Sequence, residues 1–215
     1  MNLLQHLRET RIVPVVDIAS VNDAVPVARA LQEAGLPSAE ITFRTAAAAE
    51  AIRAIATGVP GLVVGAGTVR TVEQVDQAVD AGAEFLVAPG LNPAVVARAV
   101  TLGIPMLPGV CTPTELEQAL SMGLSLLKFF PAEAAGGAAY VAALAGPYRD
   151  VLFVPTGGIG PSNILGYLAK PNVVACGGSW MVKADLIASG DFAAITRLTA
   201  EALRIVNGAK ELSRR

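Results

Sequence analysis

The chain has 215 residues, of which 53% are hydrophobic and 16% are charged, and its formal net charge is −2 at pH 7. This composition is typical of a compact core and excludes a disordered chain. The small negative charge argues against a nucleic acid or an anionic membrane as the main partner. No apolar run approaches the roughly 20 residues of a membrane span.

The N-terminus lacks the uninterrupted apolar region of a signal peptide, and the two cysteines, Cys111 and Cys176, have no metal-type spacing. We therefore expect free thiols in a cytoplasmic protein. The single histidine, His6, excludes a metal site built from several histidines. We expect it on the polar side of the first helix, as a surface residue.

Eight apolar segments alternate along the chain with segments of helical pattern. After a short amphipathic helix at 3–11, the first strand is the β-branched run at 12–16. The later strands are predicted at 39–43, 62–67, 84–88, 105–110, around Lys128, at 151–155 and at 173–176. The other helices are predicted at 24–34, 46–56, 71–81, from 93, from 113, at 138–145, at 161–169 and at 182–207, the last with a break near Gly190.

Several predicted helices begin with residues that cap an N-terminus, by accepting a hydrogen bond from the first free N–H groups. A proline in the first turn supports the same assignment. The candidates are Ser20 and Asn22 for the second helix, Thr71 with Gln74, Asn92 before Pro93, and Thr112 with Glu115.

The predicted strands are continuously apolar, which indicates burial on both faces, as in a parallel sheet. Eight strand–helix units without a linker predict one α/β domain over residues 1–215, a (β/α)8 TIM barrel with an extra N-terminal helix. A doubly wound open sheet is the alternative, but that fold rarely needs eight repeats.

Lys128 is the lysine that lies within an apolar, aromatic strand, in Leu-Leu-Lys-Phe-Phe at 126–130. The other lysines, Lys170, Lys183 and Lys210, lie in segments that we expect to be solvated. A buried ammonium is costly, so burial makes the neutral amine accessible, and this amine is a nucleophile toward carbonyl carbon. A lysine paired with a carboxylate, or one snorkelling from a strand end, is the alternative interpretation.

Polar residues gather at the predicted carboxyl ends of the strands, where barrels place their active sites. Glu40 and Lys128 are the two ionisable groups within strands that most need each other, either as a catalytic pair or as a buried structural ion pair. The other residues at this rim are Thr42 and Arg44 near strand two, Thr68 and Pro89 at the ends of strands three and four, and Thr156 at the end of strand seven.

Two glycine pairs follow the last two strands, in Thr156-Gly157-Gly158 and Gly177-Gly178-Ser179. Glycine lets backbone N–H groups approach an anion closely, and barrels often bind phosphate in these two loops. Plain tight turns would use the same residues, but two pairs on adjacent strands favour a phosphate site.

Taken together, these residues resemble a known family, the class I 2-keto-3-deoxy-6-phosphogluconate (KDPG) aldolases, of which bacterial members often also cleave 4-hydroxy-2-oxoglutarate (KHG). The resemblance covers essentially the whole chain. It rests on Ala-Glu-Ile-Thr-Phe-Arg-Thr at 39–45, Val-Gly-Ala-Gly-Thr-Val at 64–69, Ala-Pro-Gly-Leu at 88–91, Lys-Phe-Phe-Pro-Ala-Glu at 128–133, Pro-Thr-Gly-Gly-Ile at 155–159 and Gly-Gly-Ser-Trp at 177–180.

The resemblance implies a lyase that acts on a small 2-keto acid, releases pyruvate, and works as a homotrimer without a metal or cofactor. It implies that Lys128 forms the Schiff base and that Glu40 is the general acid and base. By the same resemblance, Arg44 and Thr68 hold the pyruvate carboxylate, Phe130 and Pro89 wall the pyruvyl pocket, Thr156 binds the polar chain of the substrate, and Gly157, Gly158, Gly178 and Ser179 receive the phosphate.

Asp17 departs from the family pattern, because some relatives carry a basic residue at this position of strand one. If Asp17 faces the site it would oppose a phosphate, and if it turns outward nothing changes. The alternatives are therefore aldol cleavage of the galactonate epimer or of unphosphorylated KHG, a non-covalent phosphosugar isomerase with Glu40 as base, and a non-enzymatic sugar-phosphate binder.

Overall fold

The computed structural model describes residues 2–212, in which parallel strands alternate with helices. The strands are β1 Ile12–Val16, β2 Ser38–Thr42, β3 Val63–Gly67, β4 Phe85–Val87, β5 Met106–Leu107, β6 Gly109–Val110, β7 Leu126–Phe129, β8 Leu152–Pro155 and β9 Cys176–Gly178. The helices are α1 Leu3–Thr10, α2 Ala24–Glu33, α3 Ala48–Gly58, α4 Val72–Asp80, α5 Pro93–Thr101, α6 Pro113–Ser121, α7 Gly137–Leu144, α8 Ile164–Leu168, α9 Ala184–Ala188 and α10 Phe192–Leu212, with a 3-10 turn at Val21–Asp23.

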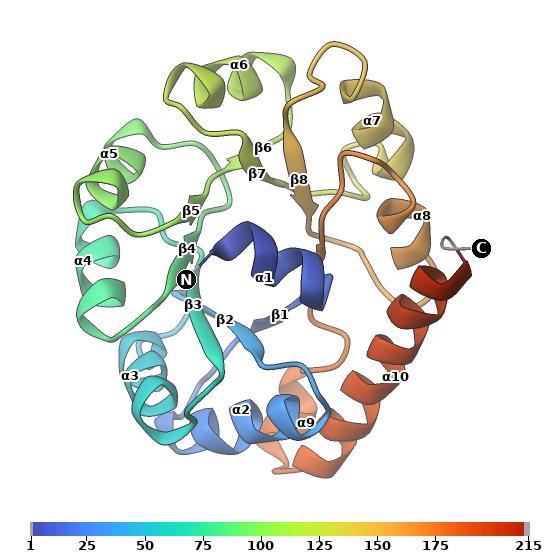
Figure 1. Ribbon diagram of the computed structural model, residues 1–215. Coiled ribbons are helices and arrows are strands. Elements are labelled where there is room, and N and C mark those ends of the chain that lie inside the picture. Colours follow the sequence, from blue (N-terminus) through green and yellow to red (C-terminus); the bar gives the residue numbers. More distant parts are fainter. Residues whose placement is uncertain (1, 213–215) are drawn as a thin grey trace.

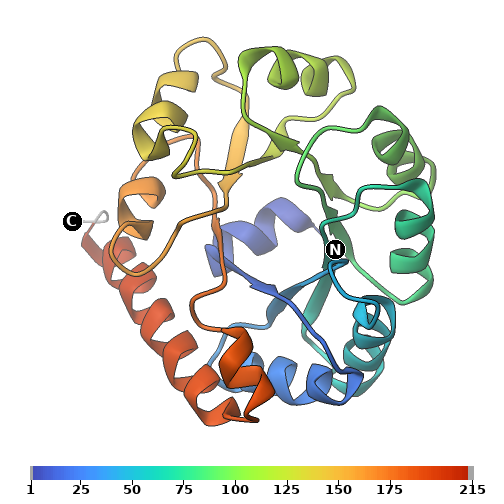
Figure 2. The same cartoon turned by 180° about the vertical axis from the view of Figure 1, so that it is seen from behind.

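The strands form a curled parallel sheet in two parts, with helices α2 to α10 on its outer side and α1 across one end (Figures 1 and 2). One part has the order β5-β4-β3-β2-β1-β9, and the other has the order β6-β7-β8. Parallel bridges from Phe153 to Val173 and from Thr156 to Gly177 connect β8 to the β9 segment. Pro108 alone separates β5 from β6. The fold is therefore α/β with a parallel curled sheet.

Two hydrophobic clusters lie on opposite faces of this sheet, because successive side chains of a strand point to opposite faces. In β1, Ile12 and Val16 belong to the cluster beneath the helices, whereas Val13 belongs to the cluster on the inner face. Leu3 and Leu7 of α1 join the inner cluster. Helix α1, which leads into β1, therefore packs against the inner face at the amino end of the strands (Figure 1).

The structure corrects two predicted strands and confirms the break in the C-terminal helical segment. The strand expected at 105–110 is divided into β5 and β6 at Pro108, which has no N–H to donate to a ladder. The strand expected at 173–176 lies at Cys176–Gly178 instead, so the second glycine pair is part of a strand that pairs with β1. The break expected near Gly190 is present and separates α9 from α10.

The predicted caps are confirmed for three helices and wrong for one. Thr71, Asn92 and Thr112 each accept a backbone hydrogen bond at the start of α4, α5 and α6. Glu115 completes the capping box with Thr112. Burial acts to raise the pKa of Glu115, but hydrogen bonds from Cys111 and Thr112 lower it overall. The helix expected from Ser20 or Asn22 instead begins after a 3-10 turn, and its start has no side-chain cap.

His6 is half-buried, so its predicted place on the surface is wrong. Among the contacts of the described residues, its Nε2 is buried without a hydrogen-bond partner. Burial lowers the pKa of His6 below 6.5, and the nearby Glu9 acts in the opposite direction. The neutral imidazole is thus the form that this position favours.

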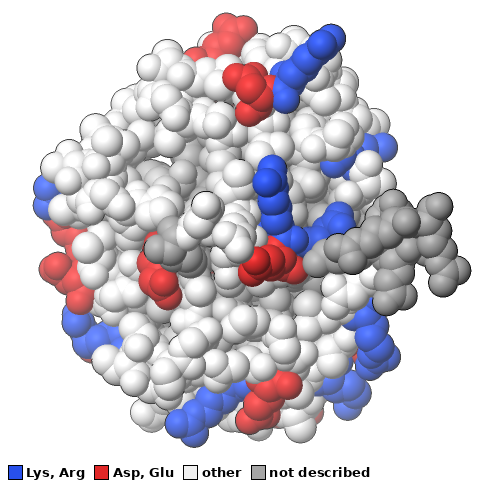
Figure 3. All heavy atoms as spheres, viewed as in Figure 1, with Lys and Arg blue, Asp and Glu red and all other residues white. Residues whose placement is uncertain are grey.

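The charged residues are dispersed over the face that Figure 3 shows, where acidic and basic side chains lie among uncharged ones. Within residues 2–212, none of the helices combines the length and the apolar character that crossing a membrane requires. The two cysteines of the chain, Cys111 and Cys176, are free thiols. Burial strongly raises the pKa of the Cys176 thiol, which favours its protonated form.

Candidate active site

Lys128 points into the interior of the curled sheet because of its position in β7. Its neighbours Leu127 and Phe129 belong to the hydrophobic cluster beneath the helices, so the alternation of a strand directs Lys128 to the inner face. The residue is only 4% exposed. Its Nζ lies 5.3 Å from the centre of the Phe130 ring, within the range of a cation–π contact. The expected burial of Lys128 is confirmed.

Glu40 reaches the same interior from the other part of the sheet. It alternates in β2 with Ala39 and Ile41, which pack beneath the helices, and it is 3% exposed. The distance from Lys128 Nζ to Glu40 Oε1 is 3.6 Å. Glu40 Oε1 has no hydrogen-bond partner within residues 2–212. A buried carboxylate oxygen without a hydrogen bond is costly, and such groups concentrate at functional sites.

Glycines of neighbouring strands make the space for this pair. A Cβ atom on Gly67 would lie 2.2 Å from Glu40 Oε1, so the glutamate carboxyl rests directly against the backbone of β3. Gly109 pairs with Lys128 across β6 and β7, and a Cβ there would lie 2.2 Å from the carbonyl oxygen of Pro89. Pro89 is therefore packed one strand away from Lys128. These glycine roles escaped the sequence analysis, since they depend on side chains and backbone from other strands.

Arg44 is held at the rim by Asp17. Its Nη1 lies 2.9 Å from Asp17 Oδ2, and the Thr42 hydroxyl donates a hydrogen bond to Asp17 Oδ1. The two carboxylate oxygens of Asp17 thus face Thr42 at the end of β2 and Arg44 just after it. Asp17 and Arg44 also line the same cavity, so the first of the two orientations considered for Asp17 is the one present. Asp17 thus brings a carboxylate to this rim, in a solvent-exposed ion pair with Arg44.

This cavity has a volume of about 150 Å³ and brings together most of the predicted binding residues. Thr156 is buried beneath it, and a Cβ on Gly177 would lie 2.3 Å from the Thr156 hydroxyl oxygen. The described residues that line it are Val15, Asp17, Arg44, Phe130, Thr156, Gly157, Gly158, Ile159, Gly177, Gly178 and Ser179.

The turn at Gly157-Gly158 requires glycine and is supported from below. Both residues have positive φ, 106° and 75°, in the left-handed region that favours glycine. The N–H of Glu133 donates to the carbonyl of Gly157 at 3.0 Å, and the Tyr167 hydroxyl donates to the Glu133 carboxylate. Burial, with this hydrogen bond, strongly raises the pKa of Tyr167, so its hydroxyl stays a donor. The Tyr167–Glu133 pair was not foreseen.

Thr68 directly follows β3 and adopts a φ of 57°. This left-handed conformation is unfavourable for a β-branched residue and costs roughly 1–3 kcal/mol. Thr68 follows Gly67, against which the Glu40 carboxyl rests. Thr68 is therefore adjacent in the chain to the residue that contacts the Glu40 carboxyl, and its backbone is strained. Strain of this kind is often retained where it positions a functional group.

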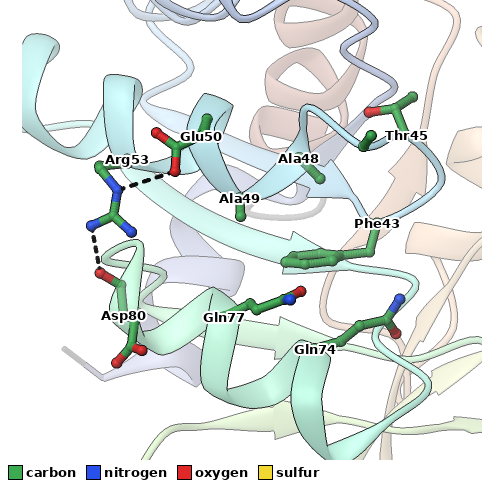
Figure 4. Close-up of a pocket in the computed structure, with 10 residues that line it drawn as sticks. Phe43, Thr45, Ala48, Ala49, Glu50, Arg53, Gln74, Gln77 and Asp80 are labelled. Atoms are coloured by element: carbon green, nitrogen blue, oxygen red, sulfur yellow. Dashed lines mark hydrogen bonds and ion pairs between the residues drawn. The ribbon is translucent and has the colours of Figure 1, made fainter.

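Two other hollows lie apart from the catalytic pair. Pro89 lines one of about 290 Å³ with Val69, Arg70 and Asn92. A larger one, of about 540 Å³, lies between α3 and α4, where Phe43 and the side chains of Gln74 and Gln77 face the opening (Figure 4). None of the predicted catalytic or binding residues lines this larger hollow, so its size does not mark the reactive site. Among residues 2–212, no cluster of three or more His, Cys, Asp or Glu side chains could hold a metal ion.

Comparisons with known proteins match this arrangement. Residues 3–198 match the model of the KDPG and KHG aldolase family. The chain is 52% identical over 206 residues to the 2-dehydro-3-deoxy-phosphogluconate aldolase of Treponema pallidum, which covers 96% of this chain and 98% of that protein.

Two solved structures are also similar over nearly the full length. The 2-keto-3-deoxy-6-phosphogluconate aldolase of Zymomonas mobilis ZM4 with 3-phosphoglycerate has a TM-score of 0.89 and 41% identity, over 95% of this chain and 96% of that one. The KDPG aldolase of Legionella pneumophila, with pyruvate captured as a covalent carbinolamine intermediate, has a TM-score of 0.90 and 37% identity, over 94% and 98% of the two chains.

Proposed function

The chain belongs to the family of KDPG and KHG aldolases, and on this premise we propose that it is a class I aldolase that cleaves KDPG to pyruvate and glyceraldehyde 3-phosphate. Cleavage of KHG to pyruvate and glyoxylate is the expected second activity. The observation that carries the proposal is the buried Lys128 nitrogen, 3.6 Å from the Glu40 carboxylate. A lysine in this setting suits covalent catalysis on a ketone.

The reaction begins with the formation of an imine. Glu40 takes the proton of the Lys128 ammonium, directly or through one water, and leaves a neutral amine. This amine attacks the C2 carbonyl carbon of the keto acid and forms a carbinolamine. Glu40 returns a proton to the C2 hydroxyl, water leaves, and a protonated imine remains between Lys128 and C2.

Carbon–carbon cleavage follows because the protonated imine accepts electrons. Glu40 removes the proton of the C4 hydroxyl, the C3–C4 bond breaks, and the aldehyde leaves with C4 as its carbonyl carbon. The electron pair of the broken bond forms the C2–C3 double bond of an enamine on Lys128. Protonation at C3 by Glu40 and addition of water at C2 then release pyruvate and restore the amine.

The remaining site residues position the substrate. Arg44 and Thr68 bind the carboxylate of the pyruvyl end, for which a guanidinium offers two parallel N–H groups. Phe130 and Pro89 wall the pyruvyl pocket, and Thr156 binds the polar chain beyond it. The distal phosphate is received by the backbone N–H groups of the two glycine segments, Gly157, Gly158, Gly178 and Ser179.

We expect the change Thr68→Gly to raise the free energy of unfolding by about 1 kcal/mol, because it relieves a left-handed conformation that glycine adopts at little cost. The same change removes the hydroxyl, so the KM for the keto acid should rise. Denaturant unfolding and steady-state kinetics measure the two effects. Thr68→Ser keeps the hydroxyl and should keep the KM near that of the original chain. An unchanged KM in Thr68→Gly would remove Thr68 from the binding role.

The proposal extends to the closure of the sheet and to assembly. The parallel bridges between β8 and the β9 segment, and the short break at Pro108, support a closed (β/α)8 barrel over one domain, in which β5 and β6 count as one strand. The homotrimer and the cytoplasmic location implied by the family stay predictions. Light scattering on the purified protein measures the assembly.

Pyruvate release from three keto acids tests the proposed activity. The protein is incubated with KDPG, its galactonate epimer and KHG, and pyruvate is followed by a coupled lactate dehydrogenase assay. We expect the highest kcat/KM for KDPG. A higher value for the galactonate epimer would reassign the substrate. Turnover of a sugar phosphate without any pyruvate would contradict aldol cleavage and favour an isomerase.

A further inference from the structure

The cleft beyond the catalytic pair continues past the small cavity that Arg44 lines. A second cavity of about 440 Å³ is lined by Trp180, Val182, Lys183 and Ala184. The two cavities share the lining residues Val15, Asp17, Gly158, Ile159 and Ser179. Asp17 therefore lies along both cavities, Arg44 lines only the inner one and Lys183 lines only the outer one.

Some charged side chains along this cleft form ion pairs, and one does not. Arg44 is paired with Asp17 at 2.9 Å, and the Thr42 hydroxyl occupies the other oxygen of Asp17. Lys183 is exposed and forms no ion pair with any side chain described in residues 2–208. Among the described lining residues, Lys183 is thus the cation whose charge is not offset by a neighbour.

Gly158 and Ser179 line both cavities, so an anionic group bound there would lie within the field of both Asp17 and Lys183. The backbone N–H groups there carry no net charge, and Arg44 lines only the inner cavity, so the repulsion that Asp17 exerts on a dianion is only partly offset. Lys183 supplies a full positive charge at the outer end, and a flexible ammonium binds phosphate as a point charge. The two side chains act on the same distal group with opposite sign.

We propose that Asp17 and Lys183 set the selectivity of this enzyme for the distal group of its substrate. Asp17 weakens the binding of a distal phosphate while it positions Arg44, and Lys183 provides the attraction that retains the phosphate. This inference rests on the proposed aldolase function and concerns the distal end of the same site. It assigns a binding role to Lys183, the residue that directly precedes α9.

The test compares two substrates that share their reacting end and differ in distal charge, namely KDPG and the unphosphorylated 2-keto-3-deoxygluconate. The measured quantity is the ratio of their kcat/KM values. Asp17→Asn should raise the ratio in favour of KDPG by roughly three- to tenfold, as expected for one screened charge near a dianion. Lys183→Gln should lower the ratio by a similar factor, and Lys170→Gln should leave it unchanged, because Lys170 lines neither cavity.

A second measurement does not depend on turnover of the weaker substrate. The inhibition constant of inorganic phosphate against KDPG should fall in Asp17→Asn and rise in Lys183→Gln, and both shifts should shrink in 1 M salt, where the screening length is only about 3 Å. A ratio that stays constant in either variant would overturn the inference. If Asp17→Asn lowers kcat/KM equally for both substrates, Asp17 only positions Arg44, and its proposed role in selectivity is wrong.

Failure of the inference is separable from failure of the proposed function. Capture of pyruvate on Lys128 by reduction involves no distal group, so it reports the covalent chemistry alone. If the original chain forms this adduct and cleaves KDPG while the ratios do not move, only the roles of Asp17 and Lys183 fail. If the original chain neither forms the adduct nor cleaves a keto acid, the aldolase function itself fails.

Discussion

Reduction of the protein with borohydride in the presence of pyruvate is expected to leave one reduced pyruvyl group on Lys128. The expectation follows from the burial of this lysine beside Glu40, which can accept the ammonium proton and leave the amine nucleophilic. Peptide mass spectrometry locates the modified residue. An enzyme molecule that carries this adduct should be inactive, because its catalytic amine is consumed.

Lys128→Met should abolish both the adduct and the release of pyruvate, since the covalent intermediate then cannot form. Methionine fills a similar volume, so the variant should keep the interior packed. Lys170→Met is the matched control, because it removes a lysine whose side chain plays no part in the mechanism, and it should retain both properties. An adduct on any other lysine, or residual cleavage close to normal in Lys128→Met, would end the Schiff-base account.

The sequence predicted the fold class because its strands are apolar on both faces and alternate with helices. Pro108 signalled a break in the strand at 105–110 that the prediction missed, whereas the approach of Pro89 to Gly109 is visible only in the structure. The strand around Gly177 was missed for a related reason. Glycine usually weakens strands, but here its missing Cβ leaves room for Thr156, a residue of the neighbouring segment.

The sequence predicted the catalytic residues of the candidate site better than the residues that surround and position them. Lys128 and Glu40 stood out because charged residues are rare inside apolar strands, and the structure brings them to 3.6 Å. The direction of Asp17 could not be predicted, since it depends on the turn after β1 and on the Arg44 side chain. The reach of Lys183 to the cleft likewise depends on where α9 begins, which the helical pattern from 182 onward did not specify.

Among changes that leave Lys128 in place, we expect the largest loss of kcat from a change of Glu40. Glu40→Gln keeps the shape of the side chain but cannot carry protons, so kcat should fall by about 10²–10⁴-fold, the usual contribution of general acid–base catalysis. Trapping of pyruvate on Lys128 should still be detectable, though slower, because the amine remains. Cleavage rates that stay unchanged would remove Glu40 from the mechanism.

The position of the Glu40 carboxyl can be tested without changing Glu40 itself. In Gly67→Ala the new methyl group would lie 2.2 Å from Glu40 Oε1, so the carboxyl must move away from its place beside Lys128. We expect a loss of kcat that approaches that of Glu40→Gln, because a displacement of about 1 Å can cost roughly 10²-fold in rate. Gly166→Ala is the matched control, since a Cβ there meets no atom within 4 Å and lies on the surface helix α8. Circular dichroism and trapping on Lys128 show whether Gly67→Ala still folds and binds pyruvate. A folded Gly67→Ala protein with normal cleavage would mean that catalysis does not require the carboxyl to lie where the structure places it.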